Sequence, residues 1–139
     1  MAVNSRRVLI GALAGGVVWN LWSILINVVA AESRYMAEQQ AGHILAQARY
    51  FFIPLWIITV FLLAYIAAWF YASVRATLGP GPGTALRVGV LLGFAIAFPL
   101  SFSTASWLAL SRMVPLLWMV DLWGGAILGT LVAGWLYRD

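Results

Sequence analysis

The chain has 139 residues, of which 64% are hydrophobic and only 9% are charged. Soluble domains carry about 25% charged residues, so this composition excludes a water-soluble globular protein and indicates a membrane protein. The formal net charge of +4 comes from arginine alone, and the absence of cysteine excludes disulfides, a thiol nucleophile and thiolate metal sites.

Four long apolar runs predict four membrane-spanning helices. They cover residues 8–30, 51–74, 88–110 and 114–137. Each run exceeds the ~20 residues with which a helix crosses a hydrocarbon core of about 30 Å. The predicted fold is therefore all-α, an integral membrane four-helix bundle of antiparallel up-down topology, with residues 1–139 in a single transmembrane domain.

The first run follows Arg6 and Arg7 and has the general order of a secretory signal. It is much longer than the roughly 7–15 apolar residues of a signal's hydrophobic region, so we expect a retained first helix.

The connection between the first two spans, residues 31–50, has a helix-forming composition. Arg34 and Glu38 are four residues apart, and the apolar residues from Ile44 to Phe52 continue at helical spacing. Gly42 is the expected breaker. We therefore expect helices 1 and 2 to extend beyond the outer face of the membrane and to turn near Gly42.

The other two connections are short and contain helix-ending residues. Gly79 is expected to end the second helix in a left-handed cap, the prolines Pro80 and Pro82 prevent its continuation, and Thr84 is expected to cap the third helix. Pro115 suits the first turn of the fourth helix. Such tight joints predict antiparallel neighbours.

The arginines favour an orientation with both termini in the cytoplasm. With four spans the termini share one side, which collects five arginines, whereas the opposite side collects Arg34, Arg49 and Arg112. The five are Arg6, Arg7, Arg75, Arg87 and Arg138. Trp69, Tyr71, Trp135 and Tyr137 are expected to anchor this cytoplasmic face at the lipid interface.

Asp121 is the only charged side chain well inside an apolar run. An aspartate at mid-helix costs about 2.5–3.5 kcal/mol on insertion, so it must face protein or water. Five other polar residues lie at a similar depth in the predicted helices: Asn20, Thr59, Ser101, Ser103 and Thr104. Asn27 joins this group because it shares a helix face with Asn20, Gly16 and Ser23. Two interpretations stay open: a polar cavity in which Asp121 binds a proton or cation, or hydrogen-bonded glue between helices.

Three glycine pairs at four-residue spacing predict close helix packing, because glycine lets helices approach one another. The pairs are Gly11/Gly15, Gly89/Gly93 and Gly125/Gly129. The partner of each ridge can lie in this chain or in another subunit. Pro99 predicts a kink in the third helix, because it removes a backbone hydrogen bond.

The chain offers little catalytic chemistry. His43 is the only histidine, and a lone histidine without cysteine or clustered carboxylates is a poor metal site. No phosphate-binding loop, nucleophile–base pair or paired carboxylates appear. We therefore expect a protein that is not an enzyme, with no metal, no cofactor and no nucleic-acid partner.

The segment from Tyr71 to Arg75, followed by the turn at residues 79–85, resembles a group of small, functionally unassigned bacterial membrane proteins with four helices. The ending Gly134-Trp135-Leu136-Tyr137-Arg138 and the opening at residues 7–11 are similar to theirs as well. The resemblance implies a four-helix fold in a bacterial inner membrane, and it implies no activity.

These features favour a non-catalytic accessory or scaffolding subunit of a larger or oligomeric membrane complex. Its partners would be the lipid bilayer and other membrane subunits or further copies of the chain. The alternative is a small oligomeric channel or proton-coupled carrier for a small solute, with Asp121 and the polar layer in the outer leaflet as the site.

Overall fold

The computed structural model of the chain describes residues 3–137. In chain order its helices are α1 (Ser5–Ile26), the π-helical turn η1 (Asn27–Ala31), α2 (Glu32–Gln40), α3 (Phe52–Leu78), α4 (Pro82–Trp107) and α5 (Met113–Leu136), and residues 3–137 contain no strand. Because α1, η1 and α2 are continuous, they form one rod of 36 residues. Four helices are thus long and apolar enough to cross a membrane, and the predicted all-α four-helix bundle is confirmed.

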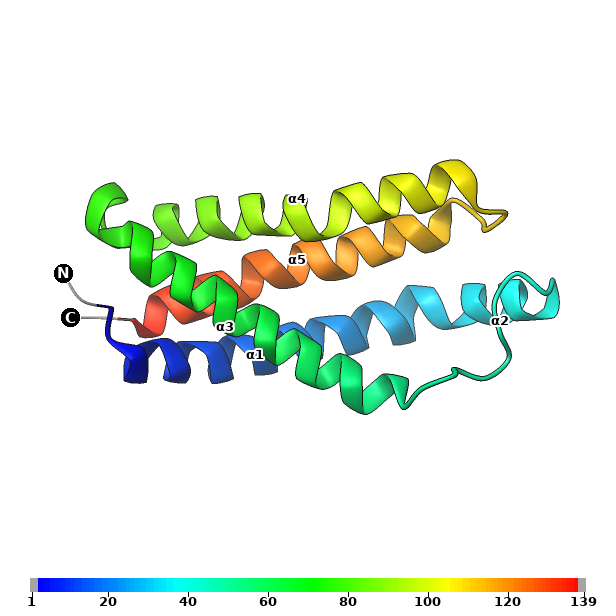
Figure 1. Ribbon diagram of the computed structural model, residues 1–139, viewed down its shortest axis with the longest axis horizontal. Coiled ribbons are helices and arrows are strands. Elements are labelled where there is room, and N and C mark those ends of the chain that lie inside the picture. Colours follow the sequence, from blue (N-terminus) through cyan, green and yellow to red (C-terminus); the bar gives the residue numbers. More distant parts are fainter. Residues whose placement is uncertain (1–2, 138–139) are drawn as a thin grey trace.

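The helices alternate in direction, so the two ends of the chain lie at the same end of the bundle (Figure 1). We call this the terminal end; it also holds the turn between α3 and α4. The opposite, distal end holds α2 and the connections at residues 41–51 and 108–112. Arg138, which contributed to the predicted orientation, lies outside the described residues.

Helix α5 lies at the centre of the bundle. It contacts α1, α3 and α4, whereas α1 and α4 make no contact with each other. Helix α3 lies obliquely across α1 and α5, so it approaches the bundle closely only along part of its length (Figure 1).

All three predicted glycine ridges are used in packing against or along α5. A Cβ at Gly15 would lie 2.6 Å from the carbonyl oxygen of Gly129, and one at Gly89 would lie 2.8 Å from the Cα of Ile127. The remaining members of the ridges, Gly11, Gly93 and Gly125, face Ala133, Trp123 and Trp19 across the same interfaces. Without an apolar driving force between helices in lipid, such close backbone approach supplies the packing energy. The glycine ridges therefore join helices of one chain.

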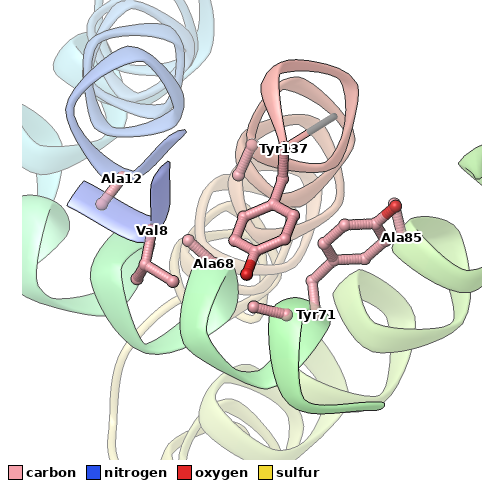
Figure 2. Close-up of a cluster of buried hydrophobic side chains, with 8 residues drawn as sticks. Val8, Ala12, Ala68, Tyr71, Ala85 and Tyr137 are labelled. Carbon is pink, nitrogen blue, oxygen red and sulfur yellow. The ribbon is translucent and has the colours of Figure 1, made fainter. Parts of the chain in front are cut away.

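Two tyrosines close the terminal end (Figure 2). Their rings meet edge to face at 6.3 Å within a cluster formed by Val8, Ala12, Ala68, Tyr71, Ala72, Ala85, Ala133 and Tyr137. The Tyr71 hydroxyl accepts a hydrogen bond from the Gly81 backbone N–H (3.1 Å), and the Tyr137 hydroxyl accepts one from Asn4 (2.9 Å). Arg75 donates to the Tyr137 carbonyl at 2.9 Å. The expectation that Tyr71 and Tyr137 are interfacial anchors is wrong, since they are 1% and 8% exposed.

The turn between α3 and α4 confirms the predicted helix end at Gly79 and corrects the predicted cap at Thr84. Gly79 ends α3 with φ 86°, a left-handed conformation that glycine adopts without strain. Helix α4 begins at Pro82, earlier than predicted, because the fixed φ and missing N–H of proline suit the first helical position. Thr84 therefore lies inside α4, where its hydroxyl donates to the Gly79 carbonyl at 2.7 Å.

The first half of the distal connection is helical as expected, and the second half is not. The first rod ends at Gln40 and Gly42 turns the chain with φ 77°, as predicted. Residues 43–51 form no helix, and α3 begins at Phe52. The reason is Pro54, which fits the first turn of a helix but would remove a backbone hydrogen bond and clash in a longer one. The second spanning helix, α3, therefore begins at Phe52 and does not extend further toward Gly42.

The α4–α5 hairpin follows the predicted pattern more closely. Helix α4 runs through Pro99 and ends at Trp107, three residues before the predicted boundary at residue 110. Helix α5 begins at Met113, which places Pro115 in its first turn as expected.

Candidate functional site

A cleft of about 910 Å³ opens between the helices at the distal end. One wall is the rod formed by α1, η1 and α2, the other wall is the distal part of α3, and the floor is α5. Ile44, Leu45 and Ala48 of the non-helical connection line its end. The cleft exists because α3 diverges from α1 toward the distal end after meeting it where Phe61 packs on Gly16.

The rod contributes a row of polar side chains to the cleft. Asn20, Ser23, Asn27, Tyr35 and Gln39 all line it, with spacings of three, four, eight and four residues. In η1 the backbone N–H of Glu32 bonds to the Asn27 carbonyl, five residues back. This π-helical turn takes more residues than an α-helical turn, so it rotates the following residues back onto the same face. The turn thus keeps the row facing the cleft beyond Asn27.

Asp121 lies on the floor of the cleft, eight residues into α5, or roughly 12 Å at 1.5 Å per residue. The Ser23 hydroxyl donates a hydrogen bond to its carboxylate. Asp121 is the only charged side chain among the described residues that line the cleft. The carboxylate is half-buried, and no arginine reaches it across the cleft.

The indole groups of α1 and α5 hold the floor in place. Trp22 donates to the Val120 carbonyl at 3.1 Å, and its ring lies on Gly124. Trp118 donates to the Tyr35 hydroxyl at 2.5 Å, which joins α5 to α2. These contacts fix α5 against the rod on both sides of Asp121.

The structure brings together only part of the predicted polar layer. Asn20, Asn27 and Asp121 meet in the cleft. Ser101 and Thr104 are buried on α4, which does not contact α1, while Ser103 and Thr59 are exposed away from the cleft. The Thr59 hydroxyl donates to the Leu55 carbonyl of its own helix at 2.7 Å. Equal depth in the membrane thus did not imply a shared face, and Asp121 bonds Ser23 rather than Asn20 or the serine cluster.

Among the hydrogen-bonding residues of the cleft, Tyr35, Gln39 and Trp118 were not predicted as part of the site. Tyr35 and Gln39 lie in the segment interpreted as a connection, although they continue the four-residue spacing of Asn27 and Ala31. Trp118 precedes Asp121 by three residues, which places both on one helix face. That spacing was the available signal.

Glu38 ties the distal connections to the rod. One of its carboxylate oxygens accepts the Ser111 backbone N–H at 3.0 Å, and the other lies 2.7 Å from Nδ1 of His43. The carbonyl of Glu38 also accepts the N–H of His43 at 3.0 Å. Residues 41–51 are therefore fastened at their start, next to the end of the cleft.

The residues that line the cleft offer hydrogen-bonding groups, and Asp121 adds a carboxylate that can carry a charge or a proton. Within residues 3–137 no cluster of three or more histidine or acidic side chains could hold a metal ion. Comparisons with protein-family models, with curated proteins and with solved structures gave no match.

Proposed function

We propose that this protein is a non-catalytic membrane carrier that holds a small solute in the distal cleft with Asp121. The observation that carries this proposal is the position of Asp121. Among the described residues it is the one charged group that lines a cleft of about 910 Å³, a volume within the range of roughly 300–1,000 Å³ typical of small-molecule sites. An acidic group inside a membrane bundle is costly and commonly marks a solute or proton pathway.

The cleft is closed toward the terminal end of the bundle. Toward the terminal end the space between α1, α3 and α5 is filled by Trp19, Val60, Ala64 and Ala126, and beyond them by the tyrosine cluster. A carrier built this way must rearrange, or assemble with a second copy, to release a solute on the other side. Exchange of a proton for a bound cation at Asp121 would couple such a change to the proton gradient.

We place the chain in a bacterial inner membrane with both termini in the cytoplasm. The arginine distribution supports this orientation, since Arg6, Arg7, Arg75 and Arg87 lie at the terminal end. The resemblance of the turn at residues 79–85 to small bacterial membrane proteins supports the location. In this orientation the cleft faces the outer leaflet.

Asp121→Asn tests the carrier proposal in proteoliposomes. The variant keeps the size of the side chain and its ability to accept from Ser23, and it removes the charge. We expect proton release driven by a solute gradient to fall at least tenfold relative to the native protein. Glu32→Gln is the matched control, because Glu32 is exposed and lies outside the cleft. Equal flux in native protein and Asp121→Asn would contradict the proposal.

The second candidate is the accessory or scaffolding subunit, and the exposed start of α3 supports it. Phe51 is 86% exposed and Ile53 is 71% exposed, and other large apolar residues up to Ile58 are exposed as well. A helix segment free on most sides offers room for a helix of another subunit. Purification in mild detergent separates the candidates. A stoichiometric partner that is lost on Ile58→Trp, which lies outside the cleft lining, and retained on Asp121→Asn would support the accessory role.

A further inference from the structure

We infer that the cleft selects a membrane-soluble amine, an amphiphile with an N–H-bearing ammonium head and an apolar tail that enters from the bilayer between α1 and α3. The inference rests on the proposed function, because it names the ligand class of the same site.

The charge of the lining fixes the sign of the head group. Within residues 3–137, Asp121 is the only charged side chain that lines the cleft, and no arginine or histidine lines it. An anionic head would meet a carboxylate with no cation to offset it, whereas an ammonium would form a charge-assisted hydrogen bond. Lipids with a net negative head group are disfavoured for the same reason.

The hydrogen bonds of the lining leave acceptors around Asp121 that an ammonium head can use. Asn20 uses an amide hydrogen on the Gly16 carbonyl at 2.9 Å, and Gln39 uses one on the Leu45 carbonyl at 3.3 Å. Ser23 gives its hydrogen to Asp121, and Trp118 gives its own to Tyr35. What remains includes a carboxylate oxygen of Asp121, the amide oxygens of Asn20, Asn27 and Gln39, and unused donors on these amides and on the Tyr35 hydroxyl. A head group with N–H donors can bond the carboxylate and the amide oxygens, whereas a quaternary ammonium has no hydrogen to donate to them.

The sides of the cleft are apolar and open to the membrane. Leu21, Ile24 and Val28 on the rod, and Ile53 and Ile57 on α3, line the cleft and are also exposed. A side chain that both lines a cleft and faces outward lies at its rim. An alkyl tail can therefore lie between α1 and α3 and continue into the acyl chains, while the head reaches Asp121.

The test uses probes of equal chain length and different heads on the full chain in detergent. Native mass spectrometry would measure binding of dodecylamine, dodecyltrimethylammonium, dodecanol and dodecanoate to the native protein, Asp121→Asn and Glu32→Gln. We expect one dodecylamine per chain, bound at least tenfold more tightly than each of the other probes. Asp121→Asn should lower its affinity at least tenfold, and Glu32→Gln should leave it unchanged.

A second variant keeps the test decisive if Asp121→Asn disturbs folding. Ile57→Trp adds bulk at the rim on α3 and leaves the Ser23–Asp121 bond in place. It should also lower dodecylamine affinity at least tenfold, with an unfolding midpoint equal to that of the native protein. Unchanged affinity in Ile57→Trp would overturn the entry between α1 and α3.

The outcomes separate the ligand class from the proposed function. If dodecanoate or dodecanol binds more tightly than dodecylamine, and this binding is lost in Asp121→Asn, the amine is the wrong ligand class. The carrier site at Asp121 would still stand. Equal binding of dodecylamine and dodecyltrimethylammonium would overturn the requirement for N–H donors. If no probe binds and solute flux is equal in native protein and Asp121→Asn, both proposals fail.

Discussion

At the terminal end of the bundle, Tyr71 and Tyr137 fill the space between the helices and their hydroxyls are hydrogen-bonded to the backbone. At the distal end, α3 diverges from α1 and leaves a cleft whose polar side chains keep unused acceptors. The difference lies in what occupies the space between helices: aromatic rings among alanines at one end, and a cavity at the other. The closed end can hold the four helices together, which leaves the open end free to admit a ligand.

The largest expected effect is at the closed end. Tyr71→Ala removes a fully buried ring and should lower the free energy of unfolding by about 3 kcal/mol, as aromatic truncations in cores do. Tyr71→Phe loses only the hydrogen bond to Gly81 and should cost about 1 kcal/mol. Denaturant unfolding in detergent micelles measures both. Equal losses for the two variants would show that the ring does not hold this end.

The middle of the bundle should respond less strongly. Gly15→Ala would place a methyl group 2.6 Å from the Gly129 carbonyl oxygen, so α1 and α5 must separate. We expect a loss of about 1–3 kcal/mol in the same unfolding assay. Gly83→Ala is the matched control, because a Cβ there meets nothing within 4 Å. If Gly15→Ala were as stable as the control, α1 and α5 could not be in close backbone contact at Gly15 and Gly129.

At the open end we expect a local effect. Glu38→Gln weakens the contact with His43 and should make local amide exchange about fivefold faster. The change should be confined to residues 41–51, and the global unfolding midpoint should stay the same. Hydrogen exchange monitored by mass spectrometry measures it. Uniformly faster exchange across α5 would contradict the separation of the two ends.

The smallest effect should come from an aromatic residue at the open end. Phe52→Ala truncates a ring that is 59% exposed and stacked only on Trp56, so the unfolding free energy should change by less than about 0.5 kcal/mol. It is the counterpart of Tyr71→Ala. A loss near that of Tyr71→Ala would mean that the start of α3 is buried in an assembly, and would favour the accessory role.

The sequence was sufficient to predict the number of helices, their approximate bounds and the inward position of Asp121. Hydropathy reports which segments enter a bilayer, and the cost of a buried carboxylate decides which way it faces. Hydropathy carries little information on which face of each helix points to the bundle interior, because lipid and protein interior are similarly apolar. For that reason Ser101, Ser103 and Thr104 were grouped with Asp121, although α5 separates α4 from the cleft.

Local backbone chemistry explains the remaining errors. The helix predicted over residues 44–51 does not form, because Pro54 favours a helix start just before it. The cap predicted at Thr84 is wrong, because Pro82 already begins α4. The π-helical turn at Asn27–Ala31 left no simple pattern, and without it Tyr35 and Gln39 could not be assigned to the cleft. Tyr71 and Tyr137 were misplaced because aromatic residues near a membrane interface can pack inward as well as outward.

The central place of α5 also bears on how the protein is made. A ribosome delivers α1, α3 and α4 to the membrane before α5. During that interval the glycines that pack against α5 have no helix to contact, because α1 and α4 do not contact each other; they are Gly11, Gly15, Gly89 and Gly93. Helices α1 and α3 can pack together before α5 arrives, but packing at these four glycines waits for the final helix. A chain arrested before Met113 would therefore present unmatched grooves to the lipid and to the proteases that clear incomplete membrane proteins.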